Sequence, residues 1–120
     1  MAQKENNIIP MIFDEAFYRK MATQKWRQQD YKKAAEYYEK VLELSPEDFD
    51  IQQHYAQCLV KLNIGKKAER LFYENIVKDF HVAESFYELS QLNIELNEPN
   101  KAFLFGINYV ILSDDKDFRE

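Results

Sequence analysis

The sequence predicts an all-α fold built from repeated helical hairpins. Only two glycines and three prolines occur in 120 residues, which is less turn punctuation than a strand-rich domain needs. Small residues recur every 34 positions, at Ala34, Ala68 and Ala102, and each follows a lysine. Further series share this step, called here the repeat period: Met21, Tyr55 and Leu89; Ala22, Ala56 and Ser90; Leu42, Ile76 and Val110. Such a period predicts a repeated pair of helices, with small residues at close helix crossings and large residues between successive pairs.

The first hairpin is predicted over residues 14–28 and 31–44. Phe17 and Met21 follow helical spacing, and Tyr18 and Ala22 lie beside them. The polar stretch QQD then interrupts the pattern, and its Asp30 is a good N-cap for the second helix. A second apolar stripe follows, made of Ala34, Tyr37, Tyr38, Val41 and Leu42.

The same period predicts a second hairpin over residues 47–62 and 66–78, and a third over 83–96 and 99–112. Ser45 is the expected cap of the helix at 47–62, with Pro46 at its first position. Asn97, Glu98 and Pro99 supply helix-start chemistry for the last helix. That last helix is apolar nearly all round, whereas a surface helix normally keeps one polar face.

The first unit resembles the tetratricopeptide repeat. In that family an aromatic, a large apolar and a small residue mark the first helix, and an acidic-aromatic turn follows. An alanine, an aromatic and a closing proline complete the pattern. The matching residues here are Tyr18, Met21, Ala22, Asp30, Tyr31, Ala34, Tyr38 and Pro46. The later units depart from it, at Phe80 and Asp114 where proline would close the unit and at Gly106 where an aromatic residue is usual.

The resemblance implies a right-handed superhelical stack of three antiparallel helical hairpins, a tetratricopeptide-like α-solenoid. We expect an apolar N-terminal extension at residues 1–13 and three repeats at about 15–48, 49–82 and 83–115. Residues 116–120 are expected to start a truncated or capping helix. The extension could cap the first hairpin or dock a partner chain through Ile8, Ile9, Met11, Ile12 and Phe13.

The last helix presents an apolar flank that needs a neighbour. In stacked repeats each hairpin buries its apolar face against the next, so a terminal hairpin needs a polar outer face. We expect an assembly surface at Phe103, Ile107, Val110 and Ile111. Further repeats of a longer chain could cover it, or a second copy of this chain could do so. A third possibility is that Gly106 lets the helix pack unusually deeply on its own hairpin.

The resemblance also implies a concave groove that is lined by the first helix of each repeat and binds a peptide or a helix. The groove-facing positions are Arg19, Thr23, Trp26, Arg27, Gln53, Gln57, Val60, Lys61, Glu84, Tyr87, Gln91, Ile94 and Glu95. The groove would be basic at one end and acidic at the other. Trp26, Tyr87 and Ile94 are candidate anchors, because large and especially aromatic side chains dominate binding energy. Trp26 could instead pack against the first hairpin or the N-terminal segment.

Composition and motifs favour an interaction protein over an enzyme. A net charge of -5 argues against a general nucleic-acid binder. The start of the chain lacks a signal-peptide pattern and no apolar run reaches the roughly 20 residues that span a bilayer, so a cytoplasmic location is expected. Cys58 is the sole cysteine, which excludes an internal disulfide, and with His54 alone it would make a weak metal site. No catalytic residue, metal or cofactor is predicted.

The predicted function is a non-enzymatic protein–protein interaction module that binds a peptide or helix in its concave groove and forms the N-terminal part of a larger repeat protein. The alternative is a small self-associating chaperone of the secretion type that holds unfolded client segments. The expected partner is a protein or peptide, not a nucleic acid or a membrane. Both a homodimer through the last hairpin and further repeats of the same chain stay open.

Overall fold

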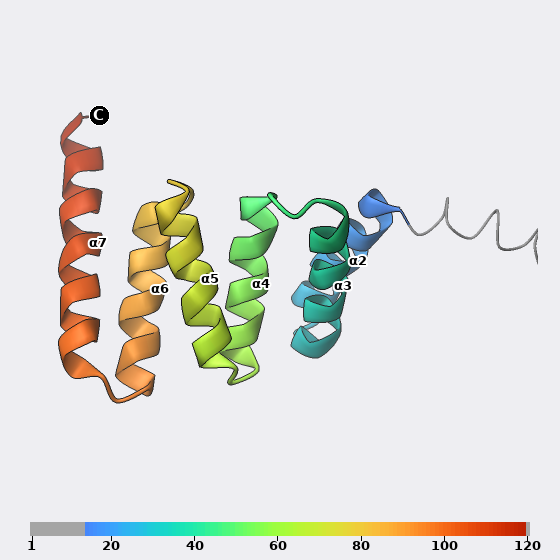
Figure 1. Cartoon of the computed structure of the whole chain (residues 1–120), viewed down its shortest axis with the longest axis horizontal. Helices are drawn as coiled ribbons and strands as arrows, with labels where there is room; N and C mark the ends of the chain where they lie inside the picture. Colours follow the sequence, from blue (N-terminus) through green and yellow to red (C-terminus); the bar gives the residue numbers. More distant parts are fainter. Residues whose placement is uncertain (1–13, 120) are drawn as a thin grey trace, which may run out of the picture.

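The computed structural model describes residues 14–119, with side chains as far as residue 113. Six helices follow one another in this range: α2 (Glu15–Arg27), α3 (Tyr31–Leu44), α4 (Phe49–Lys61), α5 (Gly65–Val77), α6 (Val82–Glu95) and α7 (Pro99–Arg119). They form three antiparallel hairpins, α2–α3, α4–α5 and α6–α7, which stack in chain order (Figure 1). The predicted all-α stack of helical hairpins is confirmed.

Aspartates cap the first three helices. Asp14, Asp30 and Asp48 each accept a hydrogen bond from the backbone N–H three residues further along the chain. Asp48 therefore caps α4, which begins two residues later than expected. Ser45, the expected cap, ends α3 instead, and its hydroxyl donates to the carboxylate of Glu15 at 2.7 Å. The Ser45 side chain, which was expected to cap α4, is therefore bonded to Glu15 of α2.

The turn inside each hairpin repeats one backbone conformation. Gln29, Asn63 and Asn97 follow one another at the repeat period and have φ angles of 61°, 63° and 61°. This left-handed conformation reverses the chain after a helix and favours glycine or asparagine. Asparagine meets that preference in two of the three turns, and Gln29 is the exception.

The core lies where the helices cross and where successive hairpins meet. Ala22, Ala34, Ala56 and Ala68 are fully buried, and Ala102 is buried as well. The large side chains buried between the helices include Tyr38, Val41, Ile51, Tyr55, Leu59, Phe72, Leu89 and Leu92. Most of the periodic small and large positions thus lie in or against the packed interior, and Val110 of the last repeat is the exception, at 53% exposure.

A buried polar cluster joins the second hairpin to α6. The side-chain amide of Asn75 in α5 donates to Gln53 of α4 at 2.7 Å and accepts a hydrogen bond from Gln52 at 3.1 Å. The hydroxyl of Ser85 in α6 donates to the same oxygen of Gln53 at 3.1 Å. Because buried polar groups need partners, these bonds hold the three helices in one register.

α7 is longer than predicted and ends at Arg119 instead of near residue 112. Residues 116–119 continue it without a break, where the start of a separate helix was expected. Residues 107–119 contain neither glycine nor proline, so nothing in them interrupts the helical hydrogen bonds. The N-terminal extension at residues 1–13, with the capping or docking role expected for it, lies outside the described residues.

Candidate functional site

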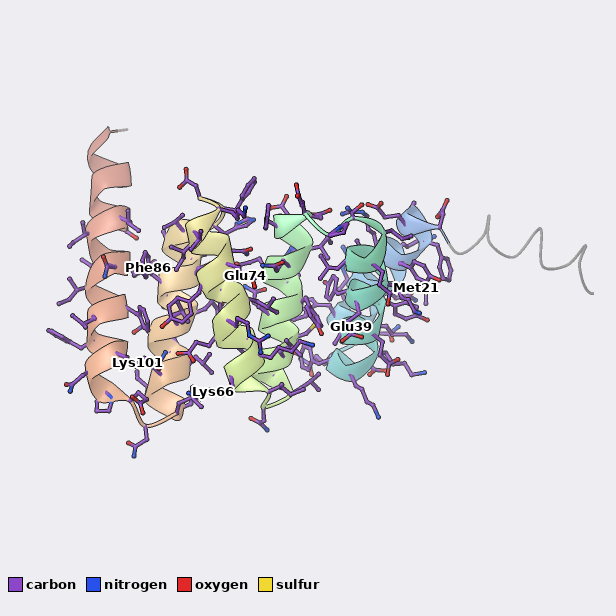
Figure 2. All side chains as sticks on the ribbon, viewed as in Figure 1. Met21, Glu39, Lys66, Glu74, Phe86 and Lys101 are labelled. Carbon is purple, nitrogen blue, oxygen red and sulfur yellow. The ribbon has the colours of Figure 1, made fainter. Side chains whose placement is uncertain are left out.

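α7 carries two apolar faces, and the described residues cover one of them. Phe105 meets the rings of Tyr73 and Phe86 with centroids 5.8 and 6.2 Å apart, and Phe86 lies between α6 and α7 (Figure 2). Tyr109 packs on Tyr87 at 5.2 Å. The exposed large apolar residues of α7 are Phe103 (67%), Leu104 (58%), Ile107 (40%), Val110 (53%) and Ile111 (52%). The helix is therefore apolar nearly all round, with one apolar face packed against the stack and a second apolar face exposed.

The open face of α7 and part of α6 form one apolar groove of about 590 Å³, called here the end groove. Its floor consists of the small residues Ser90, Ala102 and Gly106. Its walls are Ile94, Pro99, Phe103, Ile107, Val110 and Ile111. The hydroxyl of Ser90 is already used, since it donates to the backbone oxygen of Ala102 at 3.0 Å. All four residues of the expected assembly surface therefore lie together, in a groove that offers apolar contact.

Two equivalent grooves inside the stack are filled by helices. Counting back one repeat period from the end groove leads to Ala56, Gly65, Ala68 and Phe72 on the second hairpin, against which α6 packs. A Cβ atom on Gly65 would lie 3.0 Å from a side-chain carbon of Leu92 in α6. A second step back leads to the first hairpin, against which α4 packs. At the end groove no helix of the described residues takes this place, and α7 stands at the outer end of the stack (Figure 1).

Gly106 brings α7 close to α6. A Cβ atom at this position would lie 3.2 Å from the hydroxyl oxygen of Ser90. The deep packing that was considered from the sequence is thus present at this point. It does not seal the apolar flank, because Phe103 and Val110 on either side remain more than half exposed.

The residues expected in a concave groove form separate groups. On α2, a shallow basic pocket is lined by Arg19, Lys20, Thr23, Gln24 and Arg27. Arg19 is already paired, since its guanidinium donates to Glu15 of its own helix and to Asp48 before α4. The hydrogen bond to Asp48 raises the pKa of Arg19. This end of the expected groove is therefore basic, but one of its charges is used inside the stack.

A second group forms a small pocket of about 180 Å³ between α4, α6 and α7, called here the tyrosine pocket. It is lined by Gln57, Glu84, Tyr87, Glu88 and Tyr109. Gln57 donates to Glu88 at 3.3 Å, and burial raises the pKa of the Glu88 carboxyl. Tyr109 was not among the expected groove residues, because it comes from the second helix of its hairpin. The pocket is acidic and aromatic.

Comparison with known proteins finds a family match over part of the chain. A model described as "Tetratricopeptide repeat" matches residues 25–72, from the end of α2 into α5. This match supports assignment of the matched segment to the tetratricopeptide repeat family. The assignment made from the first unit is confirmed, and the family is one of non-enzymatic protein-interaction scaffolds.

One solved structure shows a similar fold over most of the chain. It is titled "Crystal structure of MamA protein" and aligns with a TM-score of 0.72 at 20% sequence identity. The alignment covers 82% of this chain and 54% of the MamA chain, so this chain spans about half of that protein's length. At this identity the likeness shows the fold. No curated protein matches the sequence.

Two residues that the tetratricopeptide pattern placed in the groove lie elsewhere. Gln53 is a correction: it is 3% exposed, and its oxygen accepts hydrogen bonds from Asn75 and Ser85. Its side chain is therefore part of the interior and not of an open groove. Ile94 is 61% exposed but lines the end groove beside Phe103.

Trp26 packs within its own tetratricopeptide hairpin. It is half-buried and meets the ring of Tyr31 edge-on at 5.2 Å. The ammonium group of Lys61, an expected groove residue on α4, lies 5.9 Å from the centre of the same Tyr31 ring. The packing of Trp26 on the first hairpin is the alternative that the sequence had left open. Gln91, by contrast, is exposed on α6.

The described residues offer no cluster for metal binding, and their one thiol is buried. No group of three or more His, Cys, Asp or Glu residues in the described part of the chain could hold a metal ion. Cys58 is fully buried, and burial raises the pKa of its thiol to about 12. The thiol therefore stays protonated at neutral pH. Of the helices described, none combines the length and apolar character that crossing a membrane requires.

Proposed function

We propose that this chain is a protein–protein interaction module that docks a helix in its end groove. The observation that carries the proposal is the equivalence of the end groove to two internal grooves, which α4 and α6 fill. Apolar surface gains about 25 cal/mol per Å² when it leaves water, so covering Phe103, Ile107 and Val110 favours association. A following hairpin of a larger repeat protein would dock in the same way, and a self-associating chaperone would use the same face.

The experiment uses a probe that the molecule itself supplies. A labelled synthetic peptide with the sequence of α6, Val82–Glu95, copies the helix that fills the internal groove. A staple between positions 87 and 91, which are exposed in α6, holds it helical, because isolated helices of this length are marginal in water. Fluorescence anisotropy at increasing protein concentration then measures docking.

The test variant is Ile107→Asp combined with Val110→Asp. We expect it to weaken peptide binding by roughly tenfold or more, because two charges would be desolvated in the groove. The matched control is Val77→Asp, which lies one repeat period before Ile111 in the equivalent hairpin and is 79% exposed. Equal affinities for wild type and the double variant would remove the end groove as a docking site.

The tyrosine pocket supports a second candidate function, the binding of a peptide on the concave face. Tyr87 is 46% exposed beside Tyr109, and Glu84 and Glu88 place carboxylates next to the rings. Aromatic rings and carboxylates together suit a Lys or Arg side chain. A basic peptide should bind more tightly than its glutamate-substituted counterpart, and Tyr87→Ala should remove the difference. A preference that persists in Tyr87→Ala would place the binding elsewhere.

A further inference from the structure

The end groove lacks a side chain that both internal grooves contain. Gly106 stands one repeat period after Phe72 and two after Tyr38, which are aromatic and almost wholly buried at 0% and 4% exposure. At the corresponding point of α7 the floor of the groove has no side chain. Phe103, three residues earlier on the same helix, is instead 67% exposed. The end groove therefore holds a hollow and a protruding ring next to each other.

The second hairpin shows how a helix meets this position. Gly65 of α5 is level with Leu92 of α6, since a Cβ atom on Gly65 would lie 3.0 Å from that side chain. The two helices are antiparallel neighbours. Phe72 lies seven residues after Gly65 in α5, and Ser85 lies seven residues before Leu92 in α6. Seven residues correspond to about 10.5 Å in either helix, so Ser85 is level with Phe72. A fully buried small residue thus lies level with a fully buried ring.

α7 is complementary to an antiparallel copy of itself in the same arrangement. If Phe103 of one copy is level with Gly106 of the second copy, the two-fold axis places the second copy's Phe103 level with Gly106 of the first. In this register Ile107 is level with the second copy's Ala102, and Val110 with the second copy's Pro99. Each pairing sets an exposed wall residue against the floor or end of the opposite groove.

Resting on the proposed function, we propose that the helix that fills the end groove is α7 of a second copy of this chain. The two copies form a two-fold dimer, in which each Phe103 ring enters the hollow over Gly106 of the other copy. Each α7 then lies in the groove between α6 and α7 of the opposite copy, which continues the mode of packing that α6 uses on the second hairpin. The four exposed residues of the expected assembly surface become buried together.

Sedimentation velocity of the chain at about 10 μM tests the proposal, and a dimer is expected. Phe103→Ala removes the ring, and Gly106→Phe fills the hollow that receives it. Each single variant should weaken dimerisation by roughly tenfold or more, because a ring that loses its site forfeits most of its burial. Gly106→Ala adds only a methyl group, which would lie 3.2 Å from the hydroxyl oxygen of Ser90, and it serves as the milder variant if Gly106→Phe does not fold, which circular dichroism detects.

The decisive variant combines both changes. In a chain with Phe103→Ala and Gly106→Phe the ring and the small residue have exchanged places, and the two-fold axis matches them again. The double variant should dimerise better than either single variant, and a mixture of the two single variants should form a heterodimer.

Three results would overturn the second-copy proposal. They are a monomeric wild-type chain, a dimer that neither single variant weakens, and a double variant no better than the singles. A monomer that still binds the α6 peptide through Ile107 and Val110 would keep the proposed function and show that another protein's helix occupies the groove. A chain that neither dimerises nor binds the α6 peptide through Ile107 and Val110 would contradict the proposed function itself.

Discussion

The side-chain nitrogen of Asn75 in α5 lies 2.7 Å from the side-chain oxygen of Gln53 in α4, and both side chains are buried. The same oxygen accepts a hydrogen bond from Ser85 of α6, so one carbonyl joins three helices. A buried polar group that loses its partner costs about 1–3 kcal/mol, which penalises any other register of these helices.

Asn75→Ala should therefore destabilise the protein by about 1–3 kcal/mol, because Gln53 and Gln52 each lose a buried hydrogen bond and a small cavity opens. Urea unfolding followed by circular dichroism measures the change. The control is Asn108→Ala on α7, where an exposed amide bonds only to its own helix at Leu104 and a change within about 0.5 kcal/mol is expected. Similar losses in both variants would contradict a special role for the buried cluster.

Phe72 and Phe103 each lie on the second helix of a hairpin, and their truncation to alanine should differ in its cost to stability. Phe72→Ala should cost about 3–5 kcal/mol, because Phe72 is 0% exposed and its removal leaves a cavity. Phe103→Ala should change the unfolding free energy of the monomer by less than about 0.5 kcal/mol, since its ring is 67% exposed. Urea unfolding at protein concentrations too low for association gives both values. A large loss in Phe103→Ala would mean that this ring is covered within one chain.

Gln29→Gly should stabilise the protein by about 0.5–1 kcal/mol. Gln29 has a φ of 61°, a left-handed conformation that glycine adopts without strain. The matched control is Gln28→Gly, whose φ of -80° needs no glycine and where a small loss is expected. Differential scanning calorimetry should show a melting temperature a few degrees higher in the first variant. A lower melting temperature in Gln29→Gly would show that its side chain contributes more than the strain removes.

Stability should fall as His81 loses its proton. Its ring nitrogens contact Glu84, at 2.8 Å, and Asp50 of the preceding hairpin. Burial lowers the pKa of His81, but the hydrogen bonds to Glu84 and Asp50 outweigh it and the net shift is upward. A folded-state pKa above the unfolded value stabilises the fold at low pH, and this contribution disappears as pH rises through the folded pKa.

Thermal unfolding between about pH 6 and pH 8 should therefore show a decline for wild type that is smaller in His81→Gln. His54→Gln replaces the other histidine, which is exposed on α4, and should keep the wild-type decline. An NMR titration of His81 gives its pKa directly. A His81 pKa below that of histidine in a model peptide would contradict a stabilising contact between His81 and Asp50 of the preceding hairpin.

The repeat period and the helical spacing of apolar positions were sufficient for the fold and for most helix ends. Both patterns record local geometry: which residues share a face of one helix, and how far apart equivalent hairpins begin. The same patterns placed Phe103, Ile107, Val110 and Ile111 on one flank of the last helix, and the structure gathers all four in the end groove. Their role in assembly stays a prediction.

Only the tertiary structure decided how neighbouring side chains divide between interior and surface. The tetratricopeptide resemblance placed Gln53 in the groove, but the approach of α5 and α6 surrounds its amide with Asn75 and Ser85 and buries it. The same holds for Trp26, which packs on Tyr31, and for Ile94, which faces the end groove. A helical period fixes the direction in which a side chain leaves its helix. How closely another helix approaches in that direction depends on contacts between residues far apart in the chain.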